Sequence, residues 1–194
     1  MKSLVSKDEI RRAVLQKRAL LSPSEIELSS SEIASLLSDK FNFFNLKISC
    51  FAPIRIKNEV NTLSLIKDLC EKNEVYLPIS DFTTASMSHW RYQPGDLLIE
   101  NRYGIPEPKL RKSSVNPEEF DVVIVPVLAM DIYGNRLGYG KGFYDRFIAA
   151  CRPDVVTIGL HFFEPLALLP VEANDRPLSY LITPKQCHDF RKIK

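Results

Sequence analysis

The run D-V-V-I-V-P-V-L-A-M, residues 121–130, constrains the fold more than any other stretch of this chain. It is nearly all apolar and lacks the alternation of apolar and polar residues that marks a strand with one solvent-facing side. Such runs are typical of a central strand in a parallel sheet that is covered on both faces. We therefore predict a buried strand over 121–130, with helices on both sides of its sheet.

The rest of the chain alternates between helical and extended patterns. Apolar residues recur at helical spacing over about 4–21, 23–39 after a Ser22 N-cap, 63–70 and 143–151. Short β-rich runs occupy 47–52, 75–77 (ended by Pro78), 89–93 and 155–160, the last central strand, and we interpret 101–117 as an ordered loop. Strands that alternate with helices imply right-handed crossovers. The predicted class is α/β: one domain over 1–194, three-layer α/β/α, with a mostly parallel, Rossmann-like open sheet.

The composition excludes several classes of protein. The net charge of the 194 residues is only +2, whereas a non-specific nucleic-acid binder would be more basic, so we expect no nucleic-acid partner. No stretch reaches the ~18 apolar residues of a membrane-spanning helix, and the charged N-terminus does not resemble a secretory signal. The four cysteines lack zinc-ligand spacing and favour reduced thiols: Cys50, Cys70, Cys151 and Cys187. We expect a cytoplasmic monomer without a membrane partner.

A glycine-rich stretch, G-N-R-L-G-Y-G-K-G-F-Y-D, follows the apolar run and contains four of the chain's 7 glycines. We call residues 134–145 the glycine loop. Gly138, Gly140 and Gly142 alternate, so the backbone can adopt left-handed angles and turn successive N–H groups into one concavity. The helix that follows points its positive end at the same place. These features favour an anionic ligand at the loop.

Charged side chains in the glycine loop indicate which anion. Arg136 and Lys141 add mobile cations, so a polyphosphate is favoured. Asp145, at the start of the following helix, would repel that anion unless a cation lay between them, and Mg²⁺ is the natural candidate because it binds carboxylate and phosphate oxygens. In open α/β sheets ligands bind beyond the carboxyl ends of the strands, where this loop is predicted to lie.

Two general nucleotide-binding motifs do not fit. In G-x-x-x-x-G-K-[ST] a hydroxyl residue is required where Gly142 stands, and in G-x-G-x-x-G the third glycine comes one residue early. A turn that only packs tightly is the alternative reading of the loop. Lys7, Arg11 and Arg18 form a second cationic group on one stripe of the first helix, although such side chains commonly pack their stems and keep their charges in solvent.

The glycine loop and the preceding V-P-V-L-A-M-D-I-Y-G resemble the 5-formyltetrahydrofolate cyclo-ligase family, also called 5,10-methenyltetrahydrofolate synthetases. Supporting matches follow in the same order along almost the whole chain: Lys7-x-x-x-Arg11, F-A-P-I…N-E-V-N-T (51–62), Y-G-I-P-E-P (103–108) and L-P-V-E-A-N-D (169–175). The resemblance implies an enzyme that converts 5-formyltetrahydrofolate to 5,10-methenyltetrahydrofolate with ATP and Mg²⁺, releasing ADP and phosphate. It implies phosphorylation of the formyl oxygen and ring closure by N10, with no protein nucleophile.

The resemblance also implies a role for each matching position. ATP would be bound by Lys7, Arg11, Arg136, Leu137, Gly138, Tyr139, Gly140, Lys141, Gly142, Phe143 and Tyr144, with Arg136 and Lys141 stabilising phosphoryl charge. The folate would meet Ile54, Glu59, Tyr139, Gly140, Lys141, Gly142 and Phe143, with Glu59 accepting from a pterin N–H. Mg²⁺ would be contacted, directly or through water, by Asp145 and Asp175. For Arg18 alone of the three cations in the first helix, we still expect a packed stem and a charge in solvent.

Some positions leave alternatives open. Phe143 stands where tyrosine is more usual in the family, and Asn174 where bacterial members often have histidine. Trp90 could line the pterin pocket or pack half-buried, and the basic segment 55–57 could meet the glutamate tail of folate or be solvated. Two other functions remain: a sugar-phosphate isomerase or CoA-transferase-like enzyme that binds one phosphate at the loop, and a non-catalytic nucleotide- or folate-binding module.

Overall fold

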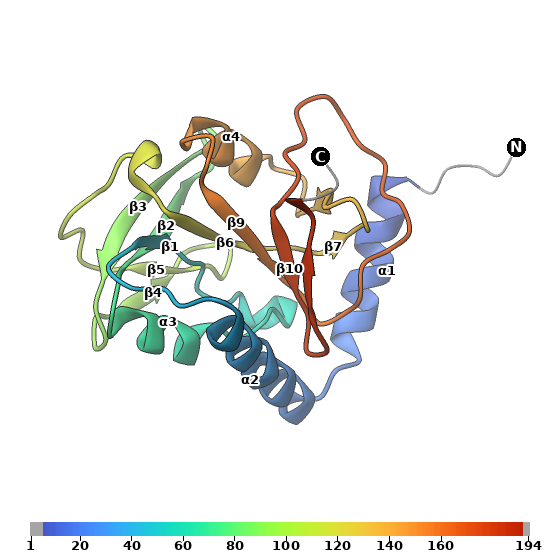
Figure 1. Cartoon of the computed structure of the whole chain (residues 1–194), viewed down its shortest axis with the longest axis horizontal. Helices are drawn as coiled ribbons and strands as arrows, with labels where there is room; N and C mark the ends of the chain where they lie inside the picture. The colour runs from blue at the N-terminus through green and yellow to red at the C-terminus, as the bar shows by residue number, and fades with distance from the viewer. Residues whose placement is uncertain (1–5, 192–194) are drawn as a thin grey trace, which may run out of the picture.

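A seven-stranded, mostly parallel β-sheet forms the centre of the computed structural model, which describes residues 6–191 (Figure 1). The strands lie in the order β11-β10-β9-β6-β1-β2-β3. The inner pairs are parallel, whereas the edge strands β3 and β11 are antiparallel to their neighbours. Their bounds are β1 Lys47–Ser49, β2 Glu74–Asp81, β3 Ser86–Tyr92, β6 Val122–Pro126, β9 Val156–Leu160, β10 Tyr180–Ile182 and β11 Cys187–Asp189. The predicted α/β class is confirmed.

The helices form where apolar residues recur at helical spacing. Their bounds are α1 Lys7–Ala19, α2 Pro23–Lys40, α3 Leu63–Cys70 and α4 Phe143–Ala150, with short 3₁₀ turns η1 Arg55–Lys57 and η2 Pro117–Glu119. Ser22 caps α2 as predicted, because its hydroxyl accepts from the Glu25 N–H at 3.2 Å. Helix α1 is capped by Ser6 in the same way, so its described start is three residues later than predicted, and residues 4 and 5 lie outside the described part.

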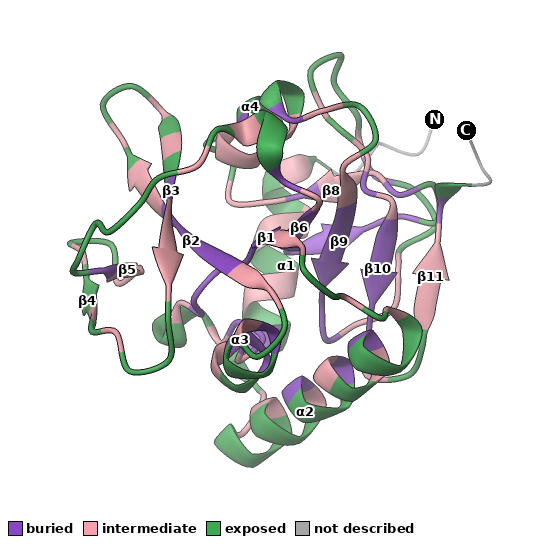
Figure 2. Ribbon diagram, turned by 60° about the vertical axis from the view of Figure 1, so that its left-hand side comes forward, coloured by how far each residue is buried: buried purple, intermediate pink, exposed green. Residues whose placement is uncertain are grey.

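Strand β6 shows why the central run is apolar on both sides. Val122 and Ile124 belong to the cluster formed with α2 and α3, whereas Val123 and Val125 pack with Phe147 of α4. Successive side chains of a strand point to opposite faces, so both faces of the sheet are covered. Figures 1 and 2 show α2 and α3 on one side and α4 on the other, with the inner strands buried. The three-layer prediction is confirmed.

The apolar run 121–130 is not one strand. Strand β6 ends at Pro126, and the run continues into β7 Ala129–Met130, which pairs with β8 Arg136–Leu137 in a separate antiparallel hairpin. Ile10 and Val14 of α1 pack on this hairpin. Continuous burial therefore reflects two elements covered by different helices, which periodicity alone cannot separate.

Three other predictions are corrected. Strand β2 runs through Pro78, because β1 pairs with β2 only as far as Tyr76 and the proline interrupts no ladder on that side. The connection 101–117 contains β5 Pro106–Pro108, which pairs with β4 Leu98–Glu100. Strand β9 is not the last central strand, because β10 lies parallel beside it and β11 follows.

The expectation for Arg18 is wrong. Its side chain does not reach solvent but lies 2% exposed beneath the glycine loop. The last turn of α1 runs under the loop, while Arg11 and Lys7, about two and three turns earlier on the same stripe, border open space.

Candidate active site

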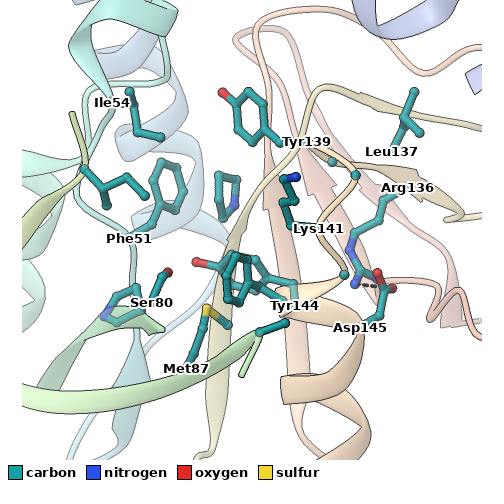
Figure 3. Close-up of a pocket in the computed structure, with 18 of the residues that line it drawn as sticks. Phe51, Ile54, Ser80, Met87, Arg136, Leu137, Tyr139, Lys141, Tyr144 and Asp145 are labelled. Carbon is teal, nitrogen blue, oxygen red and sulfur yellow. Dashed lines mark hydrogen bonds and ion pairs between the residues drawn. The ribbon is translucent and has the colours of Figure 1, made fainter. Parts of the chain in front are cut away.

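A single large cleft lies over the carboxyl ends of β1, β2 and β6. Its volume is about 1530 Å³, and it is bordered by Phe51 after β1, by Ser80 of β2 and by Pro126 of β6. Ligand pockets for one drug-sized molecule are roughly 300–1,000 Å³, so this cleft has room for two ligands. Figure 3 shows apolar Phe51, Ile54 and Met87 at one end and the Arg136–Asp145 ion pair at the other.

The glycine loop borders the cleft, and only some of its alternating glycines have backbone angles that require glycine. Gly140 (φ 86°) and Gly142 (φ 67°) are left-handed, as expected. A Cβ on Gly140 would also lie 3.1 Å from the Arg11 guanidinium, and one on Gly142 would lie 2.8 Å from Nη1 of Arg146. Gly138 is not left-handed, and a Cβ there would have no neighbour within 4 Å. The fold therefore explains two of the alternating glycines but not Gly138.

Helix α4 begins inside the cleft. Gly142 is its N-cap residue and provides no side chain, so no side-chain oxygen caps the first turn. Phe143, Tyr144 and Asp145 of that turn line the cleft. Uncapped N–H groups and the positive end of the helix dipole make this a place where an anion is stabilised.

Cations and carboxylates alternate at this end of the cleft. The guanidinium of Arg136 lies 2.6 Å from Asp145, and the Lys7 ammonium lies 2.7 Å from Asp175 and 3.0 Å from Glu172. Burial would lower the pKa of Lys7, but these carboxylates outweigh it and leave the pKa raised. Burial lowers the pKa of Arg136, with Asp145 opposing the shift. Both cations are held at the loop by acidic partners.

Two further cations border the loop. Arg11 donates from Nε to the Gly138 carbonyl at 3.0 Å and so ties α1 to the loop. Lys141 is exposed and is drawn among the residues that line the cleft in Figure 3. A basic rim with mobile and tethered members can follow the charges of a flexible polyphosphate chain.

Asp145 and Asp175 fit a magnesium site that is completed by phosphate oxygens. Asp145 accepts from the backbone N–H of Arg176 at 3.3 Å, which places it beside the residue that follows Asp175. Within residues 6–191 no group of three or more His, Cys, Asp or Glu side chains is arranged to hold a metal. Mg²⁺ commonly uses one or two carboxylates together with substrate phosphates, so two aspartates beside a cationic glycine loop could hold this ion once a polyphosphate is bound.

The other end of the cleft combines apolar walls with one buried carboxylate. Glu59 is 4% exposed; its Oε1 accepts from the Tyr139 hydroxyl at 2.6 Å and its Oε2 from the Ile54 N–H at 2.7 Å. Burial raises the pKa of Glu59, although both hydrogen bonds oppose the shift. A carboxylate has about four acceptor positions, so Glu59 can accept further N–H groups from a ligand.

Aromatic rings close this end of the cleft. The Phe82 ring lies 3.9 Å from the Tyr103 ring and 5.0 Å from the Phe143 ring, centroid to centroid, and all three residues line the cleft. They come from the β2–β3 turn, the β4–β5 turn and α4. Such rings bury flat ligands well. Neither Phe82 nor Tyr103 was predicted as a site residue, although Tyr103 stands in the Y-G-I-P-E-P motif; no pattern in the sequence marks Phe82.

The structure brings every predicted site residue to this one cleft. The lining includes Lys7, Arg11, Ile54, Glu59, Arg136, Leu137, Gly138, Tyr139, Gly140, Lys141, Gly142, Phe143, Tyr144, Asp145 and Asp175. Asn174 and Lys57 also border it. Trp90 does not, because its neighbours Met87 and His89 occupy the inner face of β3 while the indole stacks under Arg111. Other lining residues missed from the sequence include Met87, Arg102, Arg146 and Arg176.

Comparisons with known proteins identify the family to which the chain is similar. The sequence model of the 5-formyltetrahydrofolate cyclo-ligase family matches residues 3–184. The Escherichia coli K12 5-formyltetrahydrofolate cyclo-ligase is 38% identical over 137 residues, 68% of this chain and 75% of the relative. The Mycolicibacterium smegmatis enzyme of that name is 31% identical over 194 residues, 93% of this chain and 95% of the relative.

Solved structures show the same fold. The Aquifex aeolicus 5,10-methenyltetrahydrofolate synthetase superposes with a TM-score of 0.79 at 33% identity, covering 95% of this chain and 93% of the other. A Mycoplasma pneumoniae 5,10-methenyltetrahydrofolate synthetase gives 0.74 at 21% identity, covering 92% and 98%, and supports the fold alone. The family match, the two relatives and the shared fold lead to one conclusion: the chain belongs to the 5-formyltetrahydrofolate cyclo-ligase family.

Proposed function

We propose that the protein converts 5-formyltetrahydrofolate to 5,10-methenyltetrahydrofolate at the expense of ATP, with Mg²⁺ as cofactor. One observation carries the proposal: a single cleft of about 1530 Å³ joins a cationic glycine loop to an apolar end with a buried carboxylate. The first end suits a polyphosphate and the second a flat ring with N–H donors. Residues 139–143, which line the cleft, would lie between the two substrates, where phosphoryl transfer would occur.

ATP would bind at the cationic end. Lys7, Arg11, Arg136 and Lys141 would neutralise its phosphates, and the uncapped first turn of α4 would donate backbone N–H groups to them. Leu137, Gly138, Tyr139, Gly140, Gly142, Phe143 and Tyr144 would surround the nucleotide. Asp145 and Asp175 would hold Mg²⁺ against the phosphate oxygens, and the bound ion would offset the negative charge of the transferred group.

The folate would bind at the apolar end. Glu59 would accept from the pterin N–H groups, Ile54 would pack on the ring, and Gly140 to Phe143 would face the reacting atoms. In the reaction, the formyl oxygen attacks the γ-phosphorus and ADP leaves. N10 then adds to the activated carbon, loses its proton, and phosphate departs as the ring closes.

The protein would contribute positioning and charge stabilisation rather than a nucleophile. Arg136 and Lys141 border the place where the γ-phosphoryl group would be transferred, and their charge would oppose the charge that develops there. Phosphorylation of the formyl oxygen produces an imidate-type phosphate, which is labile in water. The aromatic rings of Phe82, Tyr103 and Phe143 beside the folate would shield it from water.

The test is direct. Purified protein is mixed with ATP, Mg²⁺ and 5-formyltetrahydrofolate, and the near-ultraviolet band of the methenyl product is followed, with reactions lacking ATP or Mg²⁺ as controls. Absence of the band, with the protein folded and both ligands bound, would leave the non-catalytic binding module. Nucleotide-independent turnover of a sugar phosphate would favour the isomerase or transferase alternative.

We also propose that residues 1–194 act as one domain, as a cytoplasmic monomer. The cleft is bordered by residues from α1 to the segment 172–176 of one chain, which supports a monomer. The cysteines are free, as in a reducing compartment. No helix in residues 6–191 is long and apolar enough to cross a bilayer. Size-exclusion chromatography with light scattering would measure the oligomeric state.

A further inference from the structure

A buried arginine behind the cleft has no place in the proposed reaction. Arg18, in the last turn of α1, is 2% exposed. Its Nη2 donates to the Val127 carbonyl and lies 3.2 Å from Nδ1 of His161, and its Nη1 lies 3.5 Å from the Tyr139 hydroxyl. Nε is buried without a hydrogen-bond partner. Among the described residues, these partners are all neutral.

Burying a cation in such surroundings is costly. An unpaired buried charge loses its hydration, and an unsatisfied N–H group adds to the cost. A buried charge is therefore weak evidence for a stabilising role, and it calls for another explanation. The acidic group whose pKa Arg18 lowers is Glu59, on the far side of the Tyr139 hydroxyl.

The three side chains form a directed chain of hydrogen bonds. Arginine can only donate, so Arg18 donates to the Tyr139 oxygen. The Tyr139 hydroxyl in turn donates a hydrogen bond to Oε1 of Glu59, at 2.6 Å. A phenol that accepts from a cation is a stronger donor, so Arg18 strengthens the hydrogen bond from Tyr139 to the carboxylate.

We propose that Arg18 is a positioning residue for the folate end of the cleft: acting through Tyr139, it keeps the Glu59 carboxylate ionised and directed at the ring that binds there. The inference rests on the proposed function for the identity of that ring. Loss of the cation would leave a carboxylate in an apolar environment, which favours the neutral acid. A protonated Glu59 would present a donor where the ligand also offers N–H donors.

The neighbours of Glu59 do not titrate between pH 6 and 9, so a change of charge in that range can be assigned to Glu59 itself. Arg18 of α1 and Lys57 of η1 are cationic, and both lower its pKa, while burial raises it more strongly. Burial raises the pKa of Tyr139 and Tyr144, so both phenols stay neutral below pH 9. His161 accepts from Arg18 through Nδ1, and burial together with Arg18 lowers its pKa, so it is neutral as well.

The test compares Arg18→Met and Tyr139→Phe with wild type between pH 6 and 9. Removing the cation raises the pKa of Glu59, so a higher pH is needed to ionise it. The KM for 5-formyltetrahydrofolate should rise at pH 6, by at most about tenfold per unit of pKa increase, and the defect should shrink as the pH rises. In Arg18→Met the KM for ATP should change little, because Arg18 does not line the cleft. Arg12→Met, an exposed arginine on the same helix, is the matched control.

Two further measurements separate positioning from packing. In a Glu59→Gln background, Arg18→Met should add less than about a twofold effect, because the titrating group is absent. Carbon-13 NMR of the Glu59 carboxyl, assigned with Glu59→Gln, should show its titration moving to higher pH in Arg18→Met and in Tyr139→Phe. This readout needs no substrate, so it tests the inference even if no methenyl product forms. Should Arg18→Met fail to fold, Arg18→Gln removes the same charge and gives the same comparison.

A folate defect of equal size at every pH, or one that persists in the Glu59→Gln background, would overturn the proposal and make Arg18 a packing residue. A Glu59 titration that is unchanged in Arg18→Met would overturn it as well, whatever Tyr139→Phe shows.

Discussion

Gly138→Ala tests why the glycine loop contains alternating glycines. Gly140 and Gly142 have left-handed angles, which L side chains adopt only with strain. Gly138 does not, and a methyl group there would meet no atom of the protein within 4 Å. The empty space around this position belongs to the cleft, which Gly138 lines. Folding therefore does not require glycine at 138. A ligand that lies against the backbone at this position would require it.

The expected effects on stability differ in sign along the loop. Alanine at 138 restricts the unfolded chain and should raise the free energy of unfolding by about 0.4–1 kcal/mol, or the melting temperature by roughly 1–4 °C. Alanine at 142 must adopt the left-handed region at a cost of about 1–2 kcal/mol, which should lower the melting temperature by roughly 2–8 °C. Gly95→Ala, at a left-handed turn outside the cleft, is the control for strain alone.

The expected effect on catalysis is separate from stability. A methyl group at 138 would push the phosphates from the loop, and a displacement of about 1 Å can cost about 100-fold in rate. We expect kcat/KM for ATP to fall roughly 10- to 100-fold in Gly138→Ala, without loss of stability, and to be unchanged in Gly95→Ala. Calorimetry and the methenyl-product assay measure both quantities on the same samples. A Gly138→Ala protein with wild-type kinetics would refute the reasoning and place the close approach elsewhere.

Three other predictions concern the cleft and its support. Lys141→Ala should raise the KM for ATP roughly tenfold by removing a charge aimed at the phosphates, whereas Lys185→Ala, on the surface, should not; equal values would move Lys141 out of the site. Asp145→Asn should raise the Mg²⁺ concentration for half-maximal rate at least about tenfold, and an identical Mg²⁺ titration would remove Asp145 from the metal site. Asp131 is buried and accepts from the N–H groups of Tyr133, Asn135 and Leu169. Asp131→Ala should therefore lower the free energy of unfolding, measured by urea titration, by about 2–4 kcal/mol. A decrease below about 1 kcal/mol would show that these hydrogen bonds do not stabilise the fold.

The sequence predicted those elements whose signal lies in consecutive residues. Strand β6 was predictable because burial on both faces requires apolar side chains at every position. The glycine loop was predictable because the residues with which it lines the cleft are contiguous. Strand β10 is equally buried but only three residues long, too short for any period to show. The course of β2 through Pro78 depends on where β1 stops, which is a property of the partner strand.

Arg18 shows the same limit at the level of one side chain. Helical spacing places Lys7, Arg11 and Arg18 on one stripe, and it cannot say what faces the stripe at each turn. At the N-terminal turns the stripe borders the cleft, so Lys7 reaches Asp175 and Arg11 reaches the Gly138 carbonyl. At the last turn the loop lies over the helix, and the same residue type becomes a buried cation behind Tyr139. Because the loop and the helix are more than 100 residues apart in sequence, the difference between a ligand-facing and a buried cation arises only when the two segments meet.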